Sequence, residues 1–136
     1  MSKKISFDEL LDRRVQRDAE KMKVGSIQIP GTDSFLEAVM PSAKSLMQRY
    51  GELAAATDAQ SALLCGKHAL YDCCPQLRAT KLHESLGTTA DPMSTLDELF
   101  SITDLDNMGG QALKFMGLLP SDGEEAEPPA LETVKN

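Results

Sequence analysis

Residues 62–87 read ALLCGKHALYDCCPQLRATKLHESLG, and this stretch decides the fold. Its first half carries only two formal charges, Lys67 and Asp72, and otherwise consists mainly of Ala, Gly, Leu and Cys, residue types that are often fully buried. Apolar residues recur there at helical spacing on a broad face that includes Leu64, so we predict a central helix covered on more than one side. Pro75 cannot continue a helix and disfavours helical geometry at the residue before it, so the helix should end near Asp72 or Cys73.

Before the central helix, residues 6–23 carry an amphipathic helical pattern. Ser6 and Glu9 have the spacing of a capping box, which marks a helix start. Charged residues surround a narrow apolar stripe, which consists of Phe7, Leu10, Leu11, Val15 and Met22. Such a helix either lies on its own core or acts as an arm that docks on a partner, and the pattern alone leaves both open.

Residues 24–54 predict a short hairpin followed by a second helix. Residues 24–30 alternate weakly between apolar and polar positions, a turn cluster follows, and residues 35–40 form either the second strand or a helical turn. From Ser42 the helical period returns, and we expect its apolar face to pack on the central helix. That face consists of Ala43, Leu46, Met47, Tyr50, Leu53 and Ala54. Asp58 then caps the central helix after a short connection.

After Pro75, Gly87 stands where a helix end favours positive φ, and two further helices are predicted over residues 92–100 and 104–116. Asp91 is expected as the cap of the first, with Pro at its first helical position. The pair Gly109-Gly110 weakens the second helix, so either a kink or a close helix crossing should lie there, and close packing is the favoured interpretation. Residues 120–136 are acidic and poor in large apolar groups, which predicts a disordered tail.

The length and the charge of the chain limit the classes of function that it can have. A chain of 136 residues suits one domain, predicted over residues 1–119. Aromatic residues make up 4%, which favours a helical fold, and the net charge of −7 argues against nucleic acid as a partner. Because no apolar run approaches a membrane span and no secretory core follows the charged start, we expect a cytoplasmic protein. Three cysteines, two of them adjacent, suit reduced thiols.

The sequence contains few residues that could form a metal site or a catalytic site. Its soft metal ligands are Cys65, His68, Cys73, Cys74 and His83. Their spacing is unlike that of zinc sites, so we expect buried structural thiols and neither a metal nor another cofactor. His83 could meet Cys73 or Cys74 across the Pro75 turn, but no third orienting group or oxyanion cradle is evident. We therefore expect a protein that is not an enzyme.

The segment Tyr71-Asp72-Cys73-Cys74-Pro75 with Leu77, followed by Leu82 and Leu86-Gly87, resembles a segment of phage tail assembly chaperones. The relatives in question come from contractile-tailed phages and PBSX-like defective prophages. The resemblance spans residues 7–118. It draws further on the charged helix before Ile27 and Ile29-Pro30, and on Asp91-Pro92, Leu96, Leu99-Phe100 and the helix after them. It departs at residues 30–40, where family members usually have a longer hairpin with a Gly-rich turn.

The residue patterns together predict a mainly α, compact single-domain helical bundle with a short β-hairpin after the first helix. The resemblance implies a chaperone that holds the tape measure protein soluble while the tail tube assembles, in the host bacterial cytoplasm and not in the finished particle. The tail tube protein and a second copy are further possible partners. The expected partner-binding residues are Leu96, Phe100, Leu113, Phe115 and Met116, with Phe7 and Leu11 as a second contact. A small thiol- or metal-dependent regulator and a minor structural tail component are the alternatives.

Overall fold

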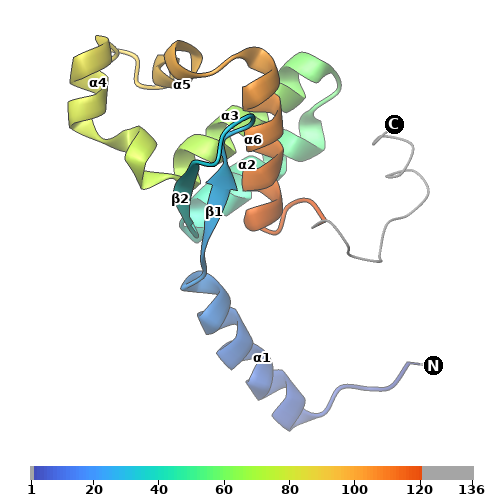
Figure 1. Cartoon of the computed structure of the whole chain (residues 1–136). Helices are drawn as coiled ribbons and strands as arrows, with labels where there is room; N and C mark the ends of the chain where they lie inside the picture. Colours follow the sequence, from blue (N-terminus) through green and yellow to red (C-terminus); the bar gives the residue numbers. More distant parts are fainter. Residues whose placement is uncertain (1, 121–136) are drawn as a thin grey trace.

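The computed structural model describes residues 2–120 (Figure 1). Its elements are α1 (Phe7–Lys21), β1 (Val24–Gln28), β2 (Phe35–Val39), α2 (Ala43–Ala55), α3 (Ala59–Cys73), the 3-10 helix η1 (Pro75–Arg78), α4 (Thr80–Leu86), α5 (Ser94–Leu99) and α6 (Ile102–Phe115). The predicted mainly helical fold with a hairpin after the first helix is confirmed. The predicted disordered tail lies, from residue 121 onward, outside the described residues.

Helix α3 is the centre of the fold, as the sequence predicts. It begins at the Asp58 cap and ends at Cys73, and it packs against α6, α2 and η1. Its buried residues are Cys65, Gly66, Ala69, Leu70 and Cys73. The expectation that Leu64 extends the buried face is wrong, because 48% of this residue is exposed.

A pair of glycines sets the distance between α3 and α6. A Cβ atom added to Gly109 would lie 2.8 Å from the backbone carbon atoms of Gly66, closer than such atoms approach in proteins. Gly110, by contrast, faces open space, and α6 continues past both glycines up to Phe115. The close crossing favoured by the sequence is therefore confirmed, and Gly109 is the glycine that it requires.

The hairpin is short, and side chains from the helices form hydrogen bonds with backbone groups on both of its edges. Ile27 and Leu36 lie opposite each other in the antiparallel register, and both are buried. Gln111 of α6 donates to the Gln28 carbonyl (3.0 Å) and accepts from the Gln28 amide (2.7 Å). Gln76 of η1 accepts from the Glu37 amide on the other edge (3.1 Å). Side chains from the helices thus supply the partners that a two-stranded sheet lacks on its own.

The starts of the last two helices differ from the prediction. Helix α5 begins at Ser94, after a turn at Pro92 and Met93, and the expectation that Asp91 caps it is wrong, because Met93 occupies the cap position without a side-chain hydrogen bond. Helix α6 begins at Ile102, where Ser101 Oγ accepts from the Asp104 amide (3.2 Å) and supplies the cap. The predicted positive φ at Gly87 is present, at 71°.

Candidate interaction surface

Helix α1 is stabilised mainly by its own residues. Ser6 Oγ accepts from the Glu9 amide (3.1 Å), and Glu9 Oε1 accepts from the Ser6 amide (2.9 Å), which completes the predicted capping box. The hydrogen bond from the Ser6 amide is the main reason that the pKa of Glu9 is lowered. Further along, Arg17 pairs with Glu20 one turn later. Local contacts therefore hold this helix without support from a core.

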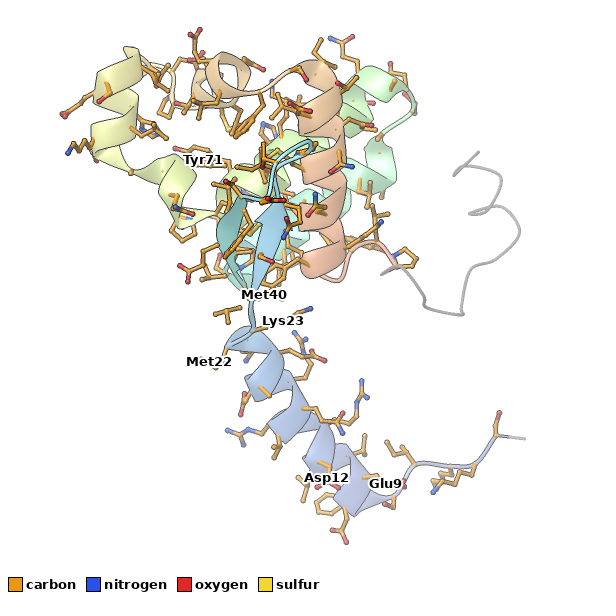
Figure 2. All side chains as sticks on the ribbon, viewed as in Figure 1. Glu9, Asp12, Met22, Lys23, Met40 and Tyr71 are labelled. Carbon is orange, nitrogen blue, oxygen red and sulfur yellow. The ribbon has the colours of Figure 1, made fainter. Side chains whose placement is uncertain are left out.

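No residue of α1 is buried. The helix projects away from the rest of the chain (Figure 1), and its side chains extend on all sides of it (Figure 2). Phe7, Val15 and Met22 are 74%, 70% and 79% exposed, and Leu10 and Leu11 are more than half exposed. The sequence left open whether this helix lies on its own core or projects as an arm. In the structure it projects as an arm. Among residues 2–120, nothing covers its apolar stripe.

The junction between α1 and the body depends on Lys23. Its ammonium group donates to the Phe115 carbonyl at the end of α6 (3.3 Å) and lies 5.0 Å from the centre of the Phe115 ring. A cation at this place complements the carboxyl end of a helix. The Phe115 ring in turn packs over Gly25, where an added Cβ would lie 2.9 Å from the ring. These contacts fix the point from which α1 departs.

A cleft of about 590 Å³ lies beside this junction. One wall carries charged side chains from the end of α1, namely Arg17, Glu20 and Lys21. The other walls are formed by the segment from Met40 to the first turns of α2 and by the end of α6, including Phe115 and Met116. Cationic and apolar groups therefore meet in one open hollow.

Helix α2 presents a second apolar stripe to the outside. Met47 is 75% and Tyr50 64% exposed, and Ala43 and Ala54 on the same face are exposed too. The expectation that this whole face packs on the central helix is therefore wrong. Leu46 and Leu53 turn towards the core, whereas the stripe through Met47 and Tyr50 points away from it.

The residues expected on the carboxy-terminal helices occupy the core instead. Leu96, Leu113 and Met116 are 0%, 4% and 5% exposed, while Phe100 and Phe115 are half-buried against the core. Leu113 follows Gly109 by one turn, so it lies on the side of α6 that crosses α3. The expectation that Leu113 lies on an open surface is wrong. Of the expected contact residues, Phe7 and Leu11 are the exposed ones.

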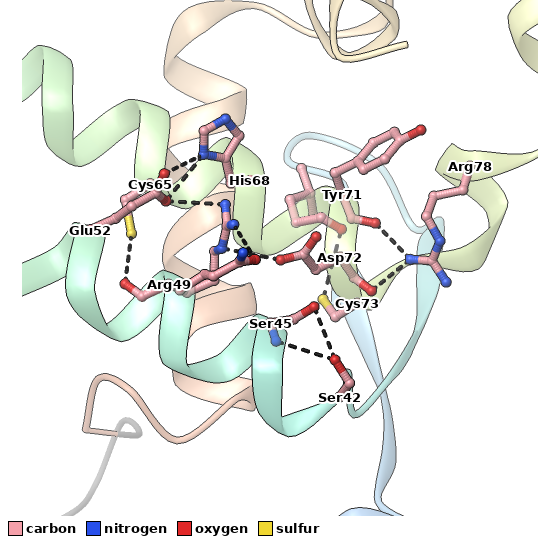
Figure 3. A network of polar contacts seen from close by, with 12 residues as sticks. Ser42, Ser45, Arg49, Glu52, Cys65, His68, Tyr71, Asp72, Cys73 and Arg78 are labelled. Atoms are coloured by element: carbon pink, nitrogen blue, oxygen red, sulfur yellow. Dashed lines mark hydrogen bonds and ion pairs between the residues drawn. The ribbon is translucent and has the colours of Figure 1, made fainter.

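A polar network joins α2 to α3 (Figure 3). Arg49 contacts Glu52 (Nη1 to Oε1, 3.1 Å) and Asp72 (Nε to Oδ2, 3.2 Å), although the latter pair is not aligned as a hydrogen bond. His68 Nδ1 lies 2.8 Å from Glu52 Oε2. Burial raises the pKa of Asp72, and the Arg49 guanidinium opposes this shift. These contacts between charged side chains connect α2 to α3. The sequence analysis did not assign this role to these residues.

The three cysteine thiols lie in the core, where they serve as packing groups. Cys65, Cys73 and Cys74 are buried and free. The Cys74 thiol, which lies 3.9 Å from that of Cys73, and burial together raise the pKa of Cys73. His83 Nε2 lies 2.8 Å from the Leu77 carbonyl, and its ring stacks on Tyr71. The imidazole is therefore in contact with a carbonyl and an aromatic ring, and neither contact is with a thiol. Within residues 2–120, no three His, Cys, Asp or Glu side chains gather as a metal site would require.

Comparisons with family models, curated proteins and solved structures found no match for this chain. Among the helices of residues 2–120, none combines the length and apolar character needed to cross a bilayer. The surface that remains as a candidate for function is therefore defined by geometry alone. It consists of the α1 stripe and the outer stripe of α2.

Proposed function

We propose that this protein is a non-enzymatic tail assembly chaperone, which binds the long helical tape measure protein and keeps it soluble while the tail tube assembles. It would act in the host bacterial cytoplasm and be absent from the finished particle. The resemblance around Tyr71-Asp72-Cys73-Cys74-Pro75 motivates the family, and the exposed stripe of α1 motivates the mode of binding.

The observation that carries the proposal is a helix of 15 residues with an apolar stripe and no buried residue. An isolated helix of this length is marginal in water, so a protein that keeps one exposed gains little stability from it. An amphipathic helix that projects from a compact body is suited to pairing with another amphipathic helix, because each covers the apolar stripe of the other. A tape measure protein is a long helical chain and offers such stripes repeatedly.

Flexible side chains suit a partner whose sequence varies along its length. Met22, the residue that caps the end of α1, and Met47 on α2 are 79% and 75% exposed. Unbranched Met side chains adapt to irregular surfaces, which allows one stripe to accept many different helix faces. This is what a chaperone for a long chain requires.

The two alternatives receive less support. A thiol-dependent regulator needs an accessible thiolate, whereas all three cysteines are buried and burial raises the pKa of Cys65. A minor structural tail component would use the same exposed stripes. It differs from a chaperone in remaining in purified particles, which is directly measurable.

The test is coexpression with the tape measure protein, with soluble complex as the readout. Val15→Asp places a charge in the α1 stripe, and Gln16→Asp places the same charge one residue away, where the side chain diverges from the stripe. Both residues are exposed, so neither variant should change the melting temperature appreciably. We expect Val15→Asp to reduce the soluble complex at least tenfold and Gln16→Asp to leave it unchanged.

Equal yields of soluble complex from the two variants would show that the α1 stripe does not bind the partner. The matched pair Met47→Asp and Gln48→Asp then tests the outer stripe of α2 in the same way, since both residues are exposed. Leu113→Asp is not a useful probe of the surface, because it would bury a charge in the core.

A further inference from the structure

The cleft beside the junction has an unbalanced set of charges. Arg17, Lys21 and Lys23 line it together with a single carboxylate, that of Glu20. Arg17 pairs with Glu20, and Lys21 lies 3.8 Å from Asp18, but these side chains remain more than half exposed. Exposed pairs of this kind are weak, so the cations remain available to another anion.

The start of α2 adds to this positive character. Ser42 and Ala43 line the cleft, and the first turn of α2 contains no acidic residue. The amino-terminal end of a helix carries partial positive charge, which here is not offset by a side chain of the same turn. The apolar parts of the walls come from residues such as Met40 and Phe115. The cleft therefore suits an acidic segment that also contains a few apolar side chains.

The chain itself contains such a segment shortly after Gly117, the last residue in the sequence that lines the cleft. Residues 121–136 have the sequence SDGEEAEPPALETVKN, with five acidic residues and one basic residue. The residue Gly117 lines the cleft, and Glu124 follows it by seven residues. Seven residues reach at most roughly 25 Å. The cleft volume of about 590 Å³ is also in the range of roughly 300–1,000 Å³ typical of binding pockets.

We propose that the acidic block at residues 122–127 of the same chain binds in this cleft, against Arg17, Lys21 and Lys23. Bound there, the segment crosses from the end of α6 to the end of α1 and fixes the angle at which α1 leaves the body. The contact is intramolecular, so it stands independently of the identity of any partner.

The test uses the full chain with a nitroxide spin label on Ala126→Cys. The natural cysteines are at most 1% exposed, so the new thiol is the one that reacts. We expect the label to broaden the backbone amide signals of Lys23, Ala43 and Gly117 far more than that of Gly31 in the hairpin turn. The broadening should fall at least fivefold between about 0.1 M salt, where the screening length is about 10 Å, and about 1 M, where it is about 3 Å.

Two matched double variants locate the contact. Arg17→Glu with Lys21→Glu changes the cleft, and Arg13→Glu with Arg14→Glu makes the same charge change on α1 outside it. The first should reduce the broadening at Lys23 and Gly117 at least fivefold, and the second less than twofold. Replacing Glu124, Glu125 and Glu127 with Gln should have the effect of the first variant without any change to the body of the protein.

Three results would overturn the proposal. One is equal broadening at Gly31 and Gly117 at low salt, and another is broadening that persists when Arg17 and Lys21 are replaced. The third is an equal loss in both double variants, which would indicate diffuse attraction to a basic helix and not a bound segment. The variant with Gln at positions 124, 125 and 127 keeps the test valid even if a body variant fails to fold.

Discussion

Helices α1 and α3 are both 15 residues long, and both begin with a capping box. One buries no residue and the other buries five. In α3, Asp58 Oδ1 accepts from the Ser61 amide (2.8 Å), much as Ser6 does for Glu9 in α1. The caps thus specify where a helix begins, and the charge content of the helix determines whether a core can form on it. In this chain, the signals that start a helix are therefore different from the features that bury it.

The largest expected difference between the two helices comes from shortening one Leu in each. Leu70→Ala removes a fully buried side chain of α3 and should lower the free energy of unfolding by about 3 kcal/mol. Leu11→Ala on α1 should change it by less than about 0.5 kcal/mol, because half of that side chain is already exposed. Urea denaturation measures both. Comparable losses would mean that α1 is packed on the body in solution.

The glycine crossing provides the next largest effect and has a control one residue away. Gly109→Ala should destabilise the protein by about 2 kcal/mol, because the new Cβ meets the backbone of Gly66, which cannot move aside. Gly110→Ala faces open space and should stabilise by up to about 1 kcal/mol through helix propensity. The two melting temperatures should move in opposite directions. Shifts of the same sign would contradict the close crossing.

The thiol at the end of α3 should matter less. Cys73→Ala removes a small buried group, and we expect a loss of about 1–2 kcal/mol without any loss of partner binding. The same burial should make all three thiols slow to react with a thiol reagent in the native state and fast in denaturant. Rapid labelling of the folded protein would argue for an accessible, functional cysteine.

The smallest effect concerns Asp72 and pH. Burial raises its pKa in the folded protein above the ordinary value of 3.8, so the folded state holds this proton more tightly than the unfolded state does. The stability that Asp72 contributes is therefore present below pH 3.8 and is lost as pH rises through the raised pKa. Relative to Asp72→Asn, the wild type should lose less than about 1 kcal/mol between about pH 3 and pH 6. A relative gain over that window would show that Arg49 outweighs the desolvation of the carboxylate.

Much of the fold follows from local signals that act within one helical turn. Ser6, Asp58 and Gly87 mark helix ends in the sequence because their side chains or positive φ satisfy the backbone of their own turn. Pro75 ends α3 by a different local effect, because it has no amide donor and disfavours helical geometry at the residue before it. The weak alternation over residues 24–30 and the turn cluster after it predict the hairpin that the structure has, and the Gly109-Gly110 pair correctly predicts a close crossing.

The sequence by itself did not determine which apolar residues meet the core. The pattern places Leu113 off the main stripe of α6, yet it is buried, because it follows Gly109 by one turn on the side of α6 that crosses α3. Met47 and Tyr50 continue an apolar face, yet they are exposed because the fold covers only the side of α2 that carries Leu46 and Leu53. A periodic pattern shows that a helix has an apolar side, whereas burial depends on neighbours distant in sequence. Only the tertiary structure places those neighbours, and it therefore decided that the exposed apolar stripes are those of α1 and of the outer side of α2.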